Sequence, residues 1–222
     1  SNPHSATPVV WTATTRAKRK GDTIKQSGNQ TIKQSSCRNP AIYADCPDVG
    51  LCADSNYVYM VSTTMHMMPG APVMRSKDML HWQTVGYCFD KFDFPGHPEY
   101  SLESANGLTA YAAGQWASSI RYHNGRFYCY FIANGLGGFM YTADKPQGPW
   151  KLHARMPFMH DASILFDDDG KAWSFHGNGW LAQLNDDLTG RANGWTGVRL
   201  FDKGEEAALL GGTPVFQHNG YS

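Results

Sequence analysis

The stretch Asp161-Ala-Ser-Ile-Leu-Phe-Asp-Asp-Asp-Gly170 decides the fold, because its design recurs along the chain. In each copy an apolar strand leads into a tight polar turn and then into a second strand. The copies are 116–125 (WASSIRYHNG), 211–220 (GGTPVFQHNG) and a looser one that starts at Asp48 and turns at 54–56. Asn-Gly and Asp-Gly between such runs favour β-hairpins, since both residue types tolerate positive φ.

The copies can be aligned by counting nine positions back from the turn glycine. That count reaches Asp161 in one copy, Trp116 in the second and Gly211 in the third, while the looser copy contributes Asp48. We therefore expect two of four equivalent strand starts to carry a carboxylate. Gly211 carries no functional group there.

The repeats predict an all-β fold of the β-propeller class. A polar segment with a late tryptophan follows the first three hairpins along the chain, and we interpret these tryptophans as blade packing: Trp82, Trp150 and Trp195. Units of ~45 to 70 residues with about four strands each are typical of propeller blades. Helices should be few and short, because no segment has apolar residues at helical spacing.

Composition excludes several classes of protein. The formal net charge is zero, so electrostatics gives no argument for a nucleic-acid partner. The sequence contains no run of about 18 apolar residues, so nothing in it predicts a membrane span. The five cysteines contain no CxxC pair and are interpreted as buried thiols rather than zinc ligands. No motif indicates a metal site or a cofactor.

Two regions differ in composition. Residues 1–38 are basic and polar with Asp22 as the only acid, so we expect a solvated leader or linker. Contact of this segment with a polyanion is the alternative. Residues 39–222 carry the blade pattern and are expected to form the ordered domain.

Several ordered motifs in the second region resemble glycoside hydrolase family 43. Cys46-Pro-Asp-Val49 and 57–64 (YVYMVSTT) resemble the first blade of that family. The segment 116–128 (WASSIRYHNGRFY) resembles its second blade, and 160–171 (HDASILFDDDGK) resembles its third. The resemblance implies a five-bladed propeller with the active site in a funnel where the innermost strands converge. On that basis the chain holds about three blades and the first strand of a fourth.

The resemblance also implies an inverting glycosidase. Such an enzyme needs a carboxylate to activate water and a carboxylic acid to protonate the leaving oxygen. A further carboxylate raises the pKa of the acid by charge repulsion. By motif, Asp48 matches the general base and Asp161 the aspartate that modulates the acid's pKa. Asp45 competes with Asp48 but lacks the preceding proline, and either matched residue could instead cap a turn or end a strand.

The family's general acid is a glutamate in a Leu-Glu-Gly motif. This chain reads Leu209-Leu-Gly-Gly212, so Gly211 stands at the matching position. Loss of general acid assistance typically lowers the rate by about 10² to 10⁴. Glu205 and Glu206 lie upstream, and one of them could replace the acid only after a local rearrangement.

Aromatic and imidazole side chains near these positions suit a sugar. We expect Trp116 to stack on a sugar ring and His66 and His160 to contact hydroxyls, with strand-end packing as the alternative. The expected partner is plant cell-wall polysaccharide or oligosaccharide, with arabinofuranosyl or xylosyl linkages as substrate, and we expect a secreted protein. A non-catalytic carbohydrate-binding remnant or an inactive fragment of a longer enzyme is the alternative function.

Overall fold

The computed structural model describes residues 40–92, 97, 111–200 and 215–216. All regular secondary structure within these ranges is β-strand, and no helix there could cross a membrane. The strands form three antiparallel sheets of four strands each, in which strands that follow one another along the chain pair with one another. The predicted all-β propeller class is therefore confirmed, with three blades described.

The strand bounds follow the repeats. The first sheet contains β1 (Gly50–Ala53), β2 (Val58–Val61), β3 (Gly70–Ser76) and β4 (Gln83–Phe89). The second contains β5 (Gln115–His123), β6 (Arg126–Ala133), β7 (Gly137–Ala143) and β8 (Lys151–Met156). The third contains β9 (Ser163–Phe166), β10 (Ala172–His176), β11 (Trp180–Gln183) and β12 (Val198–Arg199).

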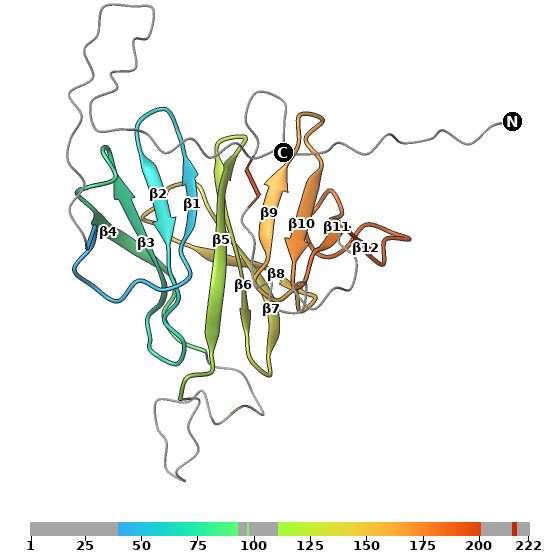
Figure 1. Cartoon of the computed structure of the whole chain (residues 1–222), viewed down its shortest axis with the longest axis horizontal. Helices are drawn as coiled ribbons and strands as arrows, with labels where there is room; N and C mark the ends of the chain where they lie inside the picture. The colour runs from blue at the N-terminus through green and yellow to red at the C-terminus, as the bar shows by residue number, and fades with distance from the viewer. Residues whose placement is uncertain (1–39, 93–96, 98–110, 201–214, 217–222) are drawn as a thin grey trace, which may run out of the picture. The chain divides into compact units, whose positions relative to one another are not determined.

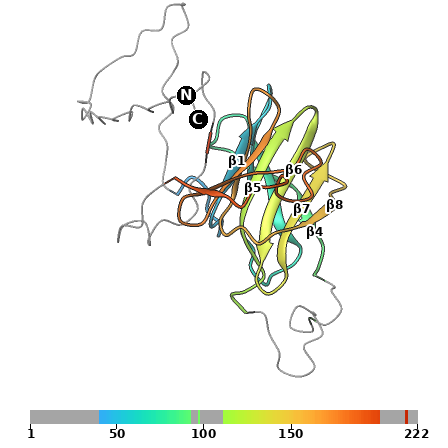
Figure 2. The same ribbon diagram turned by 90° about the vertical axis from the view of Figure 1, so that its right-hand side faces the viewer.

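The first strands of the three sheets are neighbours. Figure 1 shows β1, β5 and β9 side by side, and β5 contacts both of the others. Figure 2, turned by 90°, shows the second sheet spreading away from β5 through β6 and β7 to β8. Blades radiating from adjacent innermost strands are the arrangement of a propeller.

Strand β6 supplies both faces of the core, because its side chains alternate across the sheet. Phe127, Cys129 and Phe131 face a cluster shared with the first sheet. Tyr130 and Ile132 face a second cluster shared with the third sheet. The aromatic run that follows the Asn-Gly turn is thus buried on both sides, which explains its composition.

The thiols and one glycine reflect close packing between blades. Cys88 and Cys129 are free and buried in the first cluster, and Cys46 and Cys52 are also free. At Gly50 an added Cβ would lie 2.3 Å from the Ser118 carbonyl oxygen of β5. Only glycine lets β1 approach β5 this closely.

Strand register corrects the alignment that was counted from the turn glycine. Two residues, Asn124 and Gly125, separate the paired residues His123 and Arg126 in the second blade. In the third blade three residues, 168–170, separate Asp167 from Lys171, which are joined by a main-chain hydrogen bond. The longer loop shifts the count by one residue. Asp48 and Asp161 remain equivalent, but Ala117 rather than Trp116 occupies their position in the second blade.

Phe131→Ala tests the cluster between the first two blades. Phe131 is fully buried, and its ring stacks 5.5 Å from that of Phe139. We expect the substitution to cost about 3–5 kcal/mol and to lower the Tm by about 6–20 °C. Phe158→Ala, at a half-exposed ring, is the control and should leave the Tm nearly unchanged. Equal Tm values for the two variants would contradict the described core.

Candidate active site

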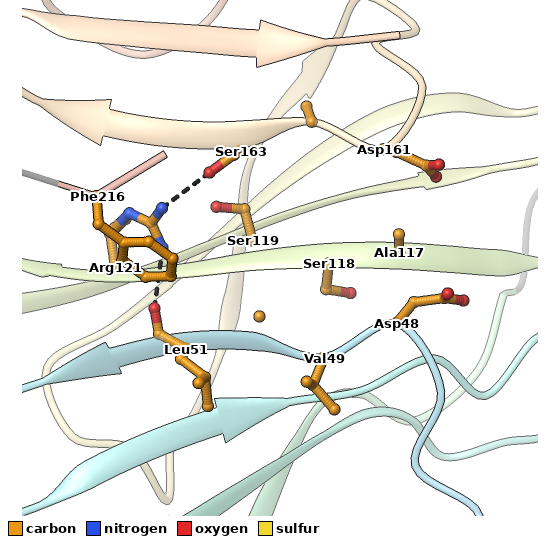
Figure 3. A pocket seen from close by; sticks show the side chains of 12 residues that line it. Asp48, Val49, Leu51, Ala117, Ser118, Ser119, Arg121, Asp161, Ser163 and Phe216 are labelled. Carbon is orange, nitrogen blue, oxygen red and sulfur yellow. Dashed lines mark hydrogen bonds between the residues drawn. The ribbon is translucent and has the colours of Figure 1, made fainter. Parts of the chain in front are cut away.

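Asp48 and Asp161 line the same cavity, although more than a hundred residues separate them in the sequence. The cavity has a volume of about 350 Å³ and lies between the first strands of the three blades. Figure 3 shows both carboxylates toward one end of it and Arg121 with Phe216 toward the other. The two aspartates expected at the active site therefore line one pocket.

Asp48 is held in place by the end of β2. The carbonyl oxygen of Pro47 accepts hydrogen bonds from the Ser62 hydroxyl at 2.7 Å and the Thr63 amide at 3.1 Å. Asp48 itself has φ 50°, in the left-handed region. This turn directs the exposed carboxylate toward the cavity before the chain enters β1.

Asp161 has the same local geometry. Its φ is 48°, and the preceding carbonyl of His160 accepts a hydrogen bond from the Gly177 amide at 2.8 Å. The register is also shared, since Gly50 pairs with Val61 and Ser163 with Phe175. The two aspartates are thus matched in backbone conformation and in the hydrogen bond that precedes them.

Tyr130 fixes the segment that leads into Asp161. Its buried hydroxyl donates to the Pro157 carbonyl at 3.0 Å and accepts from the Met159 amide at 2.9 Å. Burial raises the pKa of Tyr130, so the phenol stays neutral. Asp161 retains 22% side-chain exposure, and its Oδ2 lies 3.4 Å from the Nδ1 atom of His160.

A β-bulge in β5 includes Trp116. Gln115 pairs with Ala133 and Ser118 with Phe131, so Trp116 and Ala117 together face one residue of β6. Ala117 lines the cavity, whereas Trp116 does not belong to its lining. The indole packs against the second core cluster, with its ring 6.1 Å from that of His160.

His66 lies beside the same loop as Trp116. The Ala112 amide donates to His66 Nδ1 at 3.2 Å, and the Ala112 carbonyl accepts from the Trp116 indole at 3.0 Å. Tyr111 lies 4.9 Å from the His66 ring. His66, Trp116 and His160 therefore lie near one another, and their contact with sugar stays a prediction. Asp45 is not part of the cavity lining.

The position expected for the general acid lies outside the described residues, as do Glu205 and Glu206. The neighbouring Val215 is described, and its amide donates to Ser163 Oγ at 3.0 Å. Ile164 donates to Ser119 Oγ in the same way at 2.9 Å. Counting three residues back along the sequence from Val215, as from Ile164 to Asp161, reaches Gly212. Neither Gly211 nor Gly212 supplies a carboxylate.

Two polar residues on β5 escaped the sequence analysis. Gln115 is fully buried. Its side-chain Oε1 accepts a hydrogen bond from the Thr64 amide, and its Nε2 donates to the Ser118 hydroxyl. These bonds join the segment after β2 to β5. Arg121 lines the cavity itself. Arg121 is the single Asp, Glu, Lys or Arg in β5, and this lone charge was the signal that could have identified it.

The described residues contain no group of three or more His, Cys, Asp or Glu side chains that could hold a metal ion. His176 is buried at the end of β10, with Nδ1 3.1 Å from Ser174 Oγ. Burial lowers the pKa of His176, which favours a neutral imidazole.

The family model for glycosyl hydrolases family 43 matches residues 37–222. This chain belongs to glycosyl hydrolase family 43. A β-xylosidase of Formosa agariphila is 31% identical over 178 residues, which cover 75% of this chain and 29% of the relative. A non-reducing end α-L-arabinofuranosidase of Bacteroides ovatus is 35% identical over 128 residues, covering 55% of this chain and 22% of the relative. The chain thus spans less than a third of these family 43 relatives.

Solved structures of the family share this fold. A bifunctional GH43-CE protein of Bacteroides eggerthii is 39% identical, with a TM-score of 0.65 over 73% of this chain and 21% of that one. An engineered GH43 hydrolase with endo-xylanase and exo-arabinofuranosidase activity is 28% identical, with a TM-score of 0.71 over 82% of this chain and 36% of that one. The family 43 assignment and the blade arrangement therefore agree.

Substitutions at the two aspartates test their shared left-handed backbone. Asparagine tolerates positive φ, so Asp48→Asn and Asp161→Asn should keep the wild-type Tm. Valine is β-branched and strained there, so Asp48→Val and Asp161→Val should each cost about 1–3 kcal/mol. Thermal unfolding of the four variants measures this. Valine variants as stable as the asparagine variants would contradict the described turns.

Proposed function

We propose that this domain acts on arabinofuranosyl or xylosyl linkages of plant hemicellulose by the inverting mechanism. In this proposal Asp48 is the general base that activates water. Asp161 modulates the pKa of the acid and orients the substrate, and His66, Trp116 and His160 contact sugar. The extracellular location expected from such a polymeric substrate is part of the same proposal.

The shared cavity of Asp48 and Asp161 is the observation that supports these roles best. A base must reach a water molecule beside the sugar, and the exposed Asp48 carboxylate at the cavity is open to solvent. Asp161 is more enclosed and lies beside His160, which suits a group that orients its neighbours. The names of the family 43 relatives support the substrate class.

The glycine at position 211 supports an impaired reaction. Without a proton donor the leaving oxygen departs as an alkoxide, which is slow for an ordinary sugar. An aryl leaving group needs little protonation, so its hydrolysis depends mainly on the base. The alternative, a carbohydrate-binding domain without turnover, is favoured by the same glycine and retains the cavity and its aromatic neighbours.

Aryl and natural substrates separate these proposals. We expect slow hydrolysis of 4-nitrophenyl xyloside or arabinofuranoside by the full chain, and a rate on xylobiose or arabinoxylan about 10² to 10⁴ lower than in an enzyme with its acid. Asp48→Asn should abolish the aryl reaction, because the base is lost while the backbone conformation is tolerated. Release of nitrophenol and of reducing sugar measures the two reactions.

Gly211→Glu is the complementary gain-of-function test. The new carboxyl group should raise activity on natural linkages, while Gly211→Gln, which cannot donate a proton as an acid, should not. If the unaltered chain hydrolyses arabinoxylan with turnover of order 1 to 10³ per second, the inference that it lacks a general acid is contradicted. Glu205→Gln and Glu206→Gln would then identify the residue that replaces it. Sugar binding without any aryl hydrolysis would favour the binding domain.

A further inference from the structure

Arg121 hydrogen-bonds to the three innermost strands that the structure describes, β1, β5 and β9, and to the segment at Val215. One terminal nitrogen, Nη1, donates to the carbonyls of Leu51 at 3.0 Å and Ile120 at 2.7 Å. The other, Nη2, donates to Ser163 Oγ at 2.9 Å and to the Val215 carbonyl at 2.9 Å. These acceptors belong to β1, β5, β9 and the segment at Val215, which are distant in sequence. Figure 3 shows the bonds to Leu51 and Ser163.

Three of the four acceptors are the same atom of the repeat. In the strand register, equivalent positions are occupied by Gly50, Ser119 and Ser163. The next residues, which are therefore also equivalent, are Leu51, Ile120 and Ile164. The shared bond to a serine hydroxyl places Val215 at the position of Ile164. The guanidinium therefore binds the equivalent main-chain carbonyls of the first, second and fourth repeats, and the hydroxyl of the third.

All four of these acceptors are neutral oxygens. Desolvation lowers the pKa of Arg121, but an arginine still remains ionised at neutral pH. The nearby Cys52 does not balance the charge, because burial raises the pKa of its thiol to about 12. Carbonyl and hydroxyl dipoles thus solvate a positive charge between the innermost strands, as they would solvate a bound cation.

We propose that Arg121 is a positioning residue whose guanidinium serves as a built-in cation between the innermost strands and sets the spacing of Asp48 and Asp161. Leu51 lies three residues after Asp48, and Ser163 lies two residues after Asp161. Fixing these two acceptors to one planar group fixes the two strand starts relative to each other. The effect on catalysis rests on the proposed function, whereas the effect on stability does not.

Arg121→Ala with chemical rescue tests the proposal in the full chain. Removal leaves three carbonyls and a hydroxyl without their donor, so the Tm should fall by about 5–15 °C. Methylguanidinium at about 10 mM, far below denaturing concentrations, should restore at least half of that loss. Methylammonium at the same concentration should not, because it lacks the planar fork. Arg126→Ala is the control, since Arg126 is exposed and binds Asp144 at the surface.

The rescue should extend to the reaction. Aryl glycoside hydrolysis should fall at least tenfold in Arg121→Ala and return with the Tm on addition of methylguanidinium. If methylguanidinium restores the Tm of Arg121→Ala but leaves its rate of aryl glycoside hydrolysis unchanged, the positioning role is overturned. Absence of hydrolysis from the wild type would instead overturn the proposed function, and the Tm measurements would still decide the role of Arg121 in stability. A Tm that does not fall, or is not restored, overturns the cation site.

A measurement on the wild-type chain covers the case in which Arg121→Ala does not fold. Four acceptors prevent rotation of the terminal nitrogens, so nuclear magnetic resonance should resolve four separate Hη signals for Arg121 at 25 °C, assigned with Arg121→Lys. Arg126 should give averaged signals. Averaged signals for Arg121 as well would overturn the proposal.

Discussion

The hydrogen bond from the end of a second strand to the carbonyl preceding each aspartate is the interaction on which the site depends. It joins Thr63 to Pro47 in the first blade and Gly177 to His160 in the third. In both blades it holds the next residue at positive φ, and an aspartate occupies that residue. Since the blades repeat around adjacent innermost strands, one local rule brings two carboxylates from distant parts of the sequence into one cavity.

The two core clusters make this placement rigid. β6 packs against the first blade on one face and the third on the other, so the second blade separates the others at a set distance. The cavity lies where the first strands of the three blades meet, and part of its wall consists of short side chains from β5 such as Ala117 and Ser118. Small residues there leave open space between the aspartates and Arg121 (Figure 3).

Within the described residues, sequence patterns predicted the hairpins, the three blades and the convergence of Asp48 with Asp161, because these depend on local turn chemistry and on repetition. The predicted turn of the fourth copy, at 219–220, lies outside the described residues. The patterns placed Trp116 one position off, since the three-residue loop after β9 has no distinctive local signal. Gln115 and Arg121 were missed because their partners come from other blades, and only the folded chain shows those partners. The role of Gly211, and the boundary at residue 38, remain predictions from the sequence.

A crystal structure of the full chain with bound xylose or arabinose would show whether Asp48 and Asp161 form the sugar site. We expect a sugar in the cavity between β1, β5 and β9, with hydroxyl groups hydrogen-bonded to the carboxylates of Asp48 and Asp161. The Arg121 guanidinium should remain bonded to Leu51, Ile120, Ser163 and Val215. A sugar bound elsewhere while this cavity stays empty, or the two carboxylates at opposite ends of the blades, would contradict this expectation.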